Sequence, residues 1–459
     1  MKNIFTNRII GLTIIAASFI MSCTKPDLIN LYKAPVAKGV DVGDLTNLSG
    51  TIKGTLKTGR SYNIVGNIIV NFGDTLWLQN GVHINVAGRY GFYLHGAMIS
   101  LGTKLSPNTI TVDGVTKTDN ATQNPSTDVA FKGTWVGISC DTICPLLILK
   151  WTHIEFAGAL HNTPPSFYNV TNNGTSYPIL FQNPNGFFIM EDSWLYGSVD
   201  DAIRTYGGKI HIMRNTFEKC GLTGGEGLNM KVGTVGNIAF NVFMGIATNG
   251  PKASNKGVGT VQTNVAIYNN TIVNSGYRRS STGRGGSINY EEGSKGYSYN
   301  DLIVNCKYGF RVVPNPPADT LNLTYGNHYY YGDSLSVVNQ FYPTAYVTHP
   351  ELSDFPLYTS YLPTNYIEGA VYNAPSLVSA NDPQFVNFPL PMFNFKSVCY
   401  MGSYDFHLQG SSPAIGKGNT AFSPLINGVI LNARYGADEI TLPGADMGAY
   451  QSNGKGNQH

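Results

Sequence analysis

The stretch that decides the fold is Asn270-Thr271-Ile272-Val273-Asn274-Ser275, because related segments recur before and after it. Two earlier copies are Asn215-Thr216-Phe217 and Asn241-Val242-Phe243, and a later one is Leu302-Ile303-Val304-Asn305-Cys306. Each copy is short and has a bulky apolar residue at its centre. The pattern predicts a repeat of short strands.

Aligning the bulky residues predicts one interior column. Its members are Ile154, Trp194, Phe217, Phe243, Ile272, Ile303 and Tyr329. The steps between them are 23 to 40 residues, which is the period of a solenoid. Between the copies, segments such as Lys209-Ile210-His211-Ile212 alternate apolar and polar, as strands do. A repeat of strands without helices can close its core only by winding, so we expect an all-β parallel β-helix.

Small and amide side chains mark the predicted corners of each coil. The asparagines Asn215, Asn241 and Asn270 fit turns, because Asn tolerates left-handed geometry and can bond to the coils above and below. A second position, occupied by Cys220, Ser275 and Cys306, indicates one small interior slot.

Several segments carry a family resemblance. Phe131 to Ile138 is similar to a tryptophan-glycine coil, and Asp382 to Val386, Ser411 to Gly418 and Asp446 to Tyr450 look like a terminal module of secreted β-helix proteins. The chain therefore resembles the right-handed parallel β-helix (pectin-lyase-like) superfamily over most of residues 50–450, in a lipoprotein form of Bacteroidetes type. The resemblance implies a single-stranded right-handed solenoid whose C-terminal module caps the open end.

The predicted organisation has four parts. They are a lipoprotein signal peptide at 1–22, a flexible tether at 23–45, the β-helix at 46–375 with an irregular insertion at 333–375, and a terminal coil with capping module at 376–459. The insertion is rich in Tyr and Pro, which suits either a surface loop or an aromatic arm that stacks on sugar rings.

The N-terminus reads as a secretory signal. Lys2 and Arg8 precede the apolar run Ile9 to Ile20, which is too short to span a bilayer. Cys23 then looks like the lipidated cysteine of a lipobox, and Thr24 in place of Asp favours the outer membrane. The alternative is an ordinary signal peptide with a chance cysteine. We expect an outer-membrane lipoprotein that faces the cell surface or the periplasm and touches the membrane only through its anchor.

The charge balance excludes some partners. The chain has 30 Lys and Arg against 28 Asp and Glu, and removing the signal with Lys2 and Arg8 makes the numbers equal. Such a neutral chain argues against nucleic acid as a partner. We expect a monomer.

Cysteine and histidine spacing gives little support for a metal. Cys140 and Cys144 stand four apart and could form one small disulfide in an oxidising compartment. No zinc spacing and no clear acidic calcium triad is present, so we expect neither a metal nor a cofactor.

A second predicted column defines an outer face. Its inward residues are Ile203, Leu228, Ile246, Ile288 and Phe310. Their outward neighbours are Arg204, Asn229, Ala247, Asn289 and Arg311. Two residues further on, the outward row is Tyr206, Lys231, Asn249, Glu291 and Val313. One exposed sheet face is therefore expected to carry basic side chains interleaved with amides.

The longest insertion beside this face, residues 276–285, holds Arg278, Arg279 and Arg284. Guanidinium groups match carboxylates and sulfates bidentately. We therefore expect polysaccharide binding by Arg204, Asn229, Lys231, Arg278, Arg279, Arg284, Asn289, Glu291 and Arg311.

Catalysis stays open. A uronate lyase needs a cation to neutralise the carboxylate, a base and a proton donor. Arg204, Lys231 and Arg311 could supply the first two, and Tyr206 or Tyr290 the third. Gly227 to Gly233 resembles the basic coil of chondroitinase-like and alginate lyases, although its order and spacing depart from theirs.

A hydrolase with paired aspartates is less favoured. Asp200-Asp201 resembles the polygalacturonase pair, but the Gly-His-Gly turn and the Arg-Ile-Lys coil of that family are absent. A structural or adhesive surface protein is the third class of function that the sequence allows.

Overall fold

The computed structural model describes residues 38–118, 123–341, 353–355, 375–388, 404–425 and 440–459. The predicted signal peptide, Cys23 and the tether up to residue 37 lie outside the described residues. Lys38–His459 form one compact unit. Over the part of the chain that is described, no helix has both the length and the apolar character needed to cross a bilayer.

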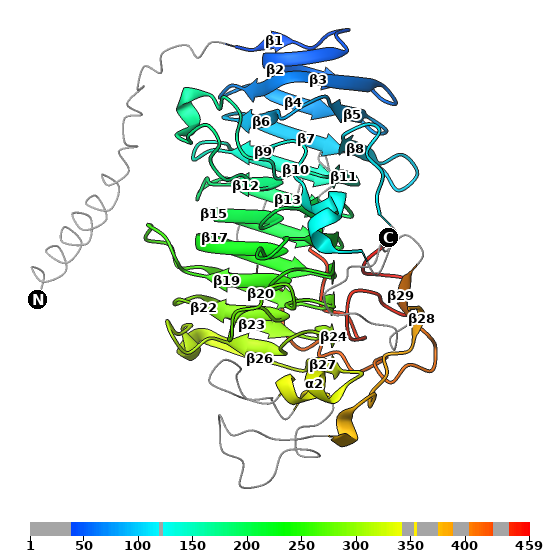
Figure 1. Cartoon of the computed structure of the whole chain (residues 1–459). Helices are drawn as coiled ribbons and strands as arrows, with labels where there is room; N and C mark the ends of the chain where they lie inside the picture. The colour runs from blue at the N-terminus through cyan, green and yellow to red at the C-terminus, as the bar shows by residue number, and fades with distance from the viewer. Residues whose placement is uncertain (1–37, 119–122, 342–352, 356–374, 389–403, 426–439) are drawn as a thin grey trace, which may run out of the picture. The chain divides into compact units, whose positions relative to one another are not determined.

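The unit is a parallel β-helix in which successive strands belong in turn to three sheets, here named A, B and C (Figure 1). It opens with β1 (Val40–Asp41), β2 (Asn47–Leu56) and β3 (Ser61–Val70). Strands β2, β3, β15 and β17 are long and contribute to more than one sheet.

Sheet A continues with β6 (Gly91–Leu94), β9 (Gly137–Cys140), β12 (Ile179–Phe181), the first parts of β15 (Ile203–Met213) and β17 (Leu228–Ala239), β19 (Pro251–Ser254), β22 (Ile288–Glu291) and β25 (Phe310–Val312). Sheet B contains β4 (Thr75–Leu78), β7 (Ala97–Leu101), β10 (Leu146–Lys150), β13 (Phe187–Glu191), the second parts of β15 and β17, β20 (Asn264–Tyr268), β23 (Lys295–Tyr299) and β26 (Leu323–Gly326). Sheet C contains β5 (His83–Val86), β8 (Asn108–Thr111), β11 (Thr152–Glu155), β14 (Trp194–Ser198), β16 (Thr216–Cys220), β18 (Val242–Met244), β21 (Thr271–Val273), β24 (Leu302–Val304) and β27 (Tyr329–Tyr331).

Helical structure is confined to short pieces between and after the strands. These are the 3₁₀ turns η1 (Pro125–Thr127), η2 (Val129–Phe131), η3 (Ser166–Tyr168), η4 (Thr320–Asn322), η5 (Asn339–Phe341) and η7 (Pro375–Leu377), and the single-turn helix α2 (Leu335–Val338). Beyond them, β28 (Phe385–Asn387) and β29 (Asp405–Leu408) form a small antiparallel pair. The predicted all-β solenoid is thus confirmed.

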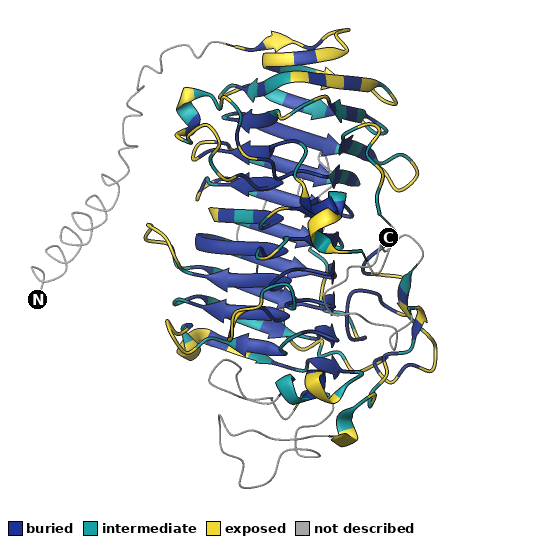
Figure 2. Cartoon of the chain, in the orientation of Figure 1, coloured by how far each residue is buried: buried dark blue, intermediate teal, exposed yellow. Residues whose placement is uncertain are grey.

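The interior column follows the predicted stacking over most of its length. Phe217 pairs with Phe243, which pairs with Ile272 and then Ile303. The rings of Phe217 and Phe243 stack with centroids 4.8 Å apart, which is the spacing of neighbouring strands. These side chains are fully buried in one continuous core, drawn dark blue in Figure 2.

Two predicted members of that column are wrong by one residue. Leu195, not Trp194, pairs with Ile154 and Phe217. At the other end, Tyr330 rather than Tyr329 pairs with Ile303. Both errors fall where two bulky residues are adjacent, so that size alone does not say which one faces inward.

A ladder of asparagines stabilises one corner of the coils. Asn215 donates from its Nδ2 to Oδ1 of Asn241, and Asn241 donates in the same way to Asn270, at 3.0 Å each. The ladder ends on Asp301, which accepts from Asn270 at 2.9 Å. Left-handed backbone occurs one residue earlier than expected, as at Phe240 (φ 56°), while the asparagines make the bonds between coils.

The second corner holds the predicted small slot. Cys220, Ser275 and Cys306 are all fully buried, and each contacts the carbonyl oxygen two residues before it. These residues fill space beside the column and need no chemical role.

The described part of the C-terminal module lies along the side of the helix, which corrects its expected place over the open end. Met447, Ala449 and Tyr450 are buried against the outer surface of sheet C, where they meet apolar residues such as Val273 and Val304. Further along, the ring of His459 lies 5.2 Å from that of Trp151, several coils nearer the N-terminus.

The last coil is covered instead by the segment that directly follows β27. Val337 and Val338 of α2 and Phe341 of η5 are buried in the main core, and Phe341 contacts Tyr330 with ring centroids 5.2 Å apart. These residues belong to the predicted insertion 333–375. The rest of that insertion, apart from 353–355 and 375, lies outside the described residues.

Candidate functional site

One row of polar side chains crosses the outer surface of sheet A. Strand pairing places Arg204 beside Asn229, then Lys252, Asn289 and Arg311. Arg204 and Arg311 therefore share a face, as predicted. The row is less open than expected, because Asn229, Lys252, Asn289 and Arg311 are each at most 7% exposed.

The structure replaces the predicted Ile246 and Ala247 in this region by Pro251 and Lys252. Pro251 pairs with Leu228, whereas Ile246 stays at the preceding corner, where its carbonyl accepts from Gly276 N. The column residue of sheet A thus lies five positions later in the chain than the predicted Ile246. Asn249 is accordingly a corner residue, and Ser254 takes its place beside Glu291 in the second row.

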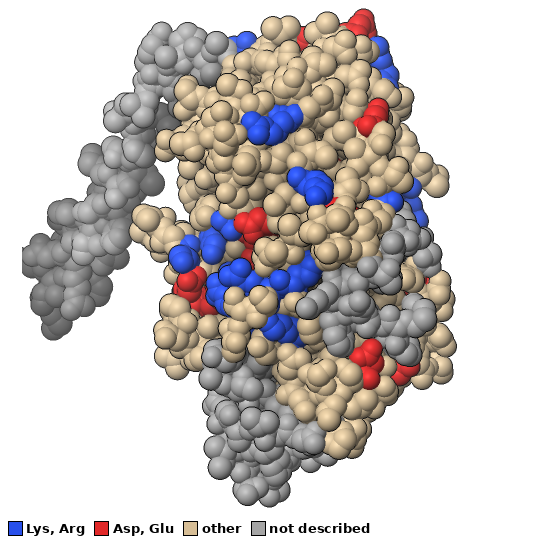
Figure 3. All heavy atoms as spheres, in the orientation of Figure 1, with Lys and Arg blue, Asp and Glu red and all other residues tan. Residues whose placement is uncertain are grey.

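Loops around the row enclose a cavity of about 290 Å³. Its basic lining residues are Arg204, Lys231, Lys252, Lys256, Arg279, Arg284 and Arg311, and its acidic ones are Asp200, Asp201, Glu226, Glu291 and Glu292. Figure 3 shows a concentration of basic side chains with a few acidic ones over this part of the molecule. Charges of both signs thus converge on one recess.

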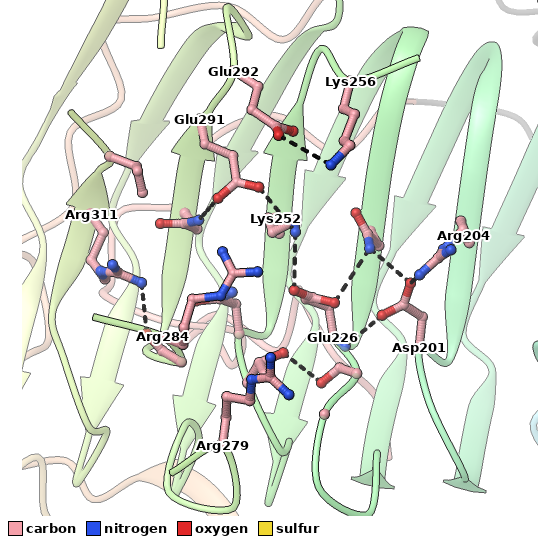
Figure 4. Close-up of a pocket in the computed structure, with 18 of the residues that line it drawn as sticks. Asp201, Arg204, Glu226, Lys252, Lys256, Arg279, Arg284, Glu291, Glu292 and Arg311 are labelled. Atoms are coloured by element: carbon pink, nitrogen blue, oxygen red, sulfur yellow. Dashed lines mark hydrogen bonds and ion pairs between the residues drawn. The ribbon is translucent and has the colours of Figure 1, made fainter. Parts of the chain in front are cut away.

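Lys252 lies at the centre of the cavity between two carboxylates (Figure 4). Its Nζ is 3.2 Å from Glu226 Oε1 and 3.1 Å from Glu291 Oε1. Burial alone would raise the pKa of Glu226, but the charge of Lys252 lowers that pKa to about 2. The same carboxylates raise the pKa of Lys252 against the effect of its burial. Lys252 therefore bridges the two acidic side chains at the centre of the cavity.

A second ion pair lies at the upstream end of the row. Asp201 Oδ2 accepts from Arg204 Nε at 2.7 Å, and its Oδ1 accepts from the backbone N–H of Glu226 at 2.9 Å. Asn229 Nδ2 connects the two acids, at 2.8 Å from Asp201 and 3.3 Å from Glu226. Burial and the nearby charge of Glu226 raise the pKa of Asp201 well above its ordinary value. Asp201 is therefore held by an ion pair and by a backbone hydrogen bond. Asp200, its neighbour, forms no ion pair with the described residues.

Two of the predicted binding arginines have structural contacts instead. Arg278 donates to the main-chain oxygens of Cys220, Gly221, Leu222 and Gly245, stacks on Phe131 at 4.7 Å, and does not line the cavity. Burial lowers the pKa of Arg278 to about 10. Arg311 lines the cavity, but its guanidinium donates to Gly283 O at 2.7 Å and Gly285 O at 2.8 Å. Arg278 is thus removed from the candidate site, and Arg311 positions the loop.

These contacts hold the loop 276–285 over the cavity. Lys307 adds to them by donating to the carbonyl oxygens of Arg279 at 2.7 Å and Arg284 at 2.8 Å. The side chains of Arg279 and Arg284 then extend from the loop toward the cavity (Figure 4). Lys256 and Glu292, 3.8 Å apart, lie on the opposite side.

Several groups in the cavity have no protein partner within the described ranges. The ammonium of Lys231 and the guanidinium groups of Arg279 and Arg284 have neither an ion pair nor a hydrogen bond there. Burial, and then the charges of Lys252 and Arg204, lower the pKa of Lys231. The Oδ1 atoms of Asn229, Asn249 and Asn289 are buried and accept no hydrogen bond. Among the described residues, the cavity thus has three cationic groups that form no ion pair and three buried amide oxygens that accept no hydrogen bond, which suits a ligand that is both anionic and rich in donors.

The two predicted tyrosine donors do not reach the cavity. Tyr206 lies beside Arg204, with its Oη 3.5 Å from Arg204 Nη1, but it is outside the lining and 36% exposed. Tyr290 points inward, and its hydroxyl donates to the carbonyl oxygens of Val265 and Tyr297. Tyr290 is buried because it alternates with Asn289 and Glu291 along β22.

The predicted disulfide is not formed. Cys140 and Cys144 are both buried and free, and burial together with the contact with Cys144 raises the pKa of the Cys140 thiol. Within the described ranges no cluster of His, Cys, Asp or Glu is suited to a metal ion.

Sequence reasoning missed Lys252, Lys256, Glu226 and Asp201 as parts of one site. Lys252 was missed because the column was placed at Ile246 and not at Pro251, whereas Glu226 lies two positions before the correctly predicted Leu228, outside the rows that were aligned. Their connection through space depends on loop packing, which has no signal in the repeat itself.

Comparison with known proteins does not identify the site. No protein-family model, curated protein or solved structure matches the chain.

Proposed function

We propose that the sheet A cavity binds an acidic carbohydrate. The observation that carries the proposal is the set of unpaired groups: Lys231, Arg279 and Arg284 lack acidic partners, and the buried amide oxygens nearby lack donors. An unpaired polar atom costs free energy where it is buried, as the three amide oxygens are, whereas the more exposed guanidinium groups of Arg279 and Arg284 are free to exchange water for a ligand.

The chemistry of the lining fits a sugar acid. A carboxylate or sulfate can accept two parallel hydrogen bonds from a guanidinium, which Arg279 and Arg284 present at the rim. Sugar hydroxyls can donate to Asn229, Asn249 and Asn289. The neighbouring carboxylates are already engaged with Lys252 and Arg204, so they do not cancel the charge at the rim.

The setting that we propose is the cell envelope. The N-terminal pattern around Cys23 supports a lipid-anchored protein of the outer membrane, with a polysaccharide as its partner and the anchor as its only membrane contact. The binding chemistry described above calls on no cofactor. A purely structural or adhesive role is the outcome if no carbohydrate binds.

A second candidate function is a polysaccharide lyase that acts on uronate by β-elimination. It is favoured by one observation, the lowered pKa of the buried Lys231, since lowering the pKa of an amine increases the share of the neutral form that can serve as a general base. Arg279 and Arg284 would neutralise the substrate carboxylate. Tyr290 cannot be the proton donor, because it points into the core. Tyr206 lies outside the cavity lining and could act only by turning toward the cavity.

The test is a titration with matched sugars. Uronate and sulfated oligosaccharides are compared by calorimetry with neutral oligosaccharides of the same length, using wild type, Lys231→Met and the double variant Arg279→Gln/Arg284→Gln. We expect binding only of the acidic series and a loss of at least about tenfold in each variant, equivalent to about 1.4 kcal/mol. Arg89→Gln, an exposed arginine outside the cavity, is the matched control.

The lyase alternative is tested on the same samples. Cleavage by β-elimination creates an unsaturated sugar whose ultraviolet absorbance increases with time. An increase in wild type that Lys231→Met abolishes would establish catalysis. Binding without any increase leaves the carbohydrate-binding function alone, and equal affinity for neutral and acidic sugars would overturn the proposal.

A further inference from the structure

The row of sheet A is closed just upstream of the cavity. Continuing the row from Arg204 toward the N-terminus, the pairing partners are Leu180, Ser139 and Tyr93. Leu180 and Tyr93 are buried beneath the segment 159–177, which joins β11 to β12 and contributes Tyr168 and Tyr177 to the same aromatic cluster. The segment therefore lies across the face where a groove would otherwise continue.

Tyr177 brings this segment directly against the candidate site. Its ring lies 4.1 Å from the guanidinium carbon of Arg204, and only 8% of the residue is exposed. The segment is further held by a hydrogen bond of 3.0 Å between the Tyr93 hydroxyl and Nδ1 of His161. The upstream wall is thus packed and bonded to the sheet.

The downstream end of the row is also covered. Arg311 is 2% exposed, because the loop carbonyls of Gly283 and Gly285 lie on its guanidinium. Between the two walls lie Asn229, Lys252 and Asn289, on β17, β19 and β22, and all three line the cavity. Two strand spacings separate the first from the last, which is about 10 Å.

The remaining two sides are bounded as well. Arg279 and Arg284 project from one side, and the Lys256–Glu292 pair stands on the other (Figure 4). The enclosed volume of about 290 Å³ is at the small end of pockets that hold compact ligands.

We infer that this site takes the end of an acidic glycan, one or two terminal sugar units, and not the interior of a chain. A polymer running along the row would collide with Tyr177 at one end and with the Gly283–Gly285 loop at the other. The inference rests on the proposed function and deepens it, since it specifies which part of the ligand is recognised. It also replaces the long groove expected from the sequence.

The experiment uses one uronate oligosaccharide in a series of lengths, from the monosaccharide to the octasaccharide. Each member is titrated into the protein and the affinity is measured by calorimetry. We expect the affinity per chain to reach its maximum at the disaccharide and then to stay within about twofold. On a long polymer, the number of proteins bound should equal the number of chain ends. An affinity that keeps rising beyond the tetrasaccharide, or many proteins bound per polymer, would overturn end recognition while leaving acidic-carbohydrate binding intact. If no member of the series binds, the proposed function itself fails.

A variant of the wall gives a second readout. Tyr177→Ala removes the ring beside Arg204, and we expect the octasaccharide to gain affinity relative to the disaccharide. Phe167→Ala is the matched control, because Phe167 belongs to the same segment and packs on the same cluster but stacks on His95, with ring centroids 3.7 Å apart, and does not line the cavity. An unchanged length dependence in a folded Tyr177→Ala protein would count against the wall. If that variant does not fold, the wild-type series decides alone.

Discussion

Lys231 and Lys252 are near neighbours in the same cavity, but their surroundings differ in charge. Lys252 has a carboxylate on each side, whereas the ammonium of Lys231 faces other cations and no carboxylate within bonding distance in the described residues. The first lysine therefore belongs to the protein's own charge balance. Lys231 carries a positive charge that forms no ion pair in the described residues, and a bound anion would neutralise it.

Replacing each lysine by methionine separates the two roles. Lys252→Met leaves Glu226 and Glu291 buried without a cation, and we expect the free energy of unfolding to fall by about 3–5 kcal/mol. Lys231→Met removes a buried charge that has no partner and is expected to leave stability equal or higher. Urea unfolding followed by fluorescence measures both. A larger loss in Lys231→Met than in Lys252→Met would contradict this account of the cavity.

Buried histidines predict how stability depends on pH. Burial lowers the pKa of His161 and of His211 from 6.5 to about 4. Between these values the unfolded chain binds protons that the folded chain does not, so the free energy of unfolding falls as pH drops from 6.5 toward 4 and is unaffected by these groups above 6.5.

His211→Gln should make that decline shallower by up to about 1.4 kcal/mol per pH unit, the contribution of one proton. Denaturant titrations at several pH values measure the slope. Equal slopes in wild type and variant would show that His211 has the same pKa in the folded and unfolded states.

At the scale of single elements, the asparagine ladder shows how burial decides the value of a hydrogen bond. Asn241 bonds to Asn215, to Asn270 and to the carbonyl oxygen of Ile212 in a site without solvent access. Near the N-terminal end, Asn63 bonds in the same way to Asn47 and Asn85, but in an exposed ladder where water can replace a lost amide.

Asn241→Ala should accordingly lower the free energy of unfolding by about 3 kcal/mol, because it leaves buried polar groups of the adjacent coils unsatisfied. Asn63→Ala is the matched surface control and should change it by less than about 0.5 kcal/mol. Thermal and urea unfolding of the two variants test the difference. Similar losses at both sites would refute the role of burial.

The corners of the coils explain why part of the site could not be predicted. Strand segments are recognisable from alternation, and five members of the interior column were aligned correctly on that basis. Corner lengths vary from coil to coil, so Ile246 was assigned to sheet A although it belongs to the turn before it. That displacement hid Lys252, the residue at the centre of the cavity. The side chains of Arg278 and Arg311 were misjudged for another reason: their partners are main-chain oxygens, which leave no trace in a sequence.

For the molecule as a whole, the period, the absence of helical segments between the strands and the family resemblance together predicted the solenoid. The placement of the C-terminal module was beyond such reasoning. A solenoid offers both an end and a side to cover, and the sequence does not say which of the two the module packs against. The structure shows that the apolar outer stripe of sheet C, including Val273 and Val304, receives the module.

Met447 tests that packing. It is fully buried against sheet C, so Met447→Asp places a charge in an apolar contact and should lower the midpoint of thermal unfolding and increase binding of a hydrophobic dye. Met447→Leu keeps the volume and should cost less than about 1.5 kcal/mol. Equal behaviour of the two variants would show that this contact contributes little.

The sideways course of the C-terminal segment also affects the order in which the molecule can be completed. Coils wound from residues 38–331 can stack one after another as the chain is synthesised, since each contacts mainly its neighbour. The outer stripe of sheet C stays uncovered throughout that time, because the residues that seal it, around 447–459, are made more than a hundred positions later. A chain that has wound its coils before the last residues dock would expose an apolar stripe along sheet C, and we expect such a chain to be more prone to associate with another than the finished molecule.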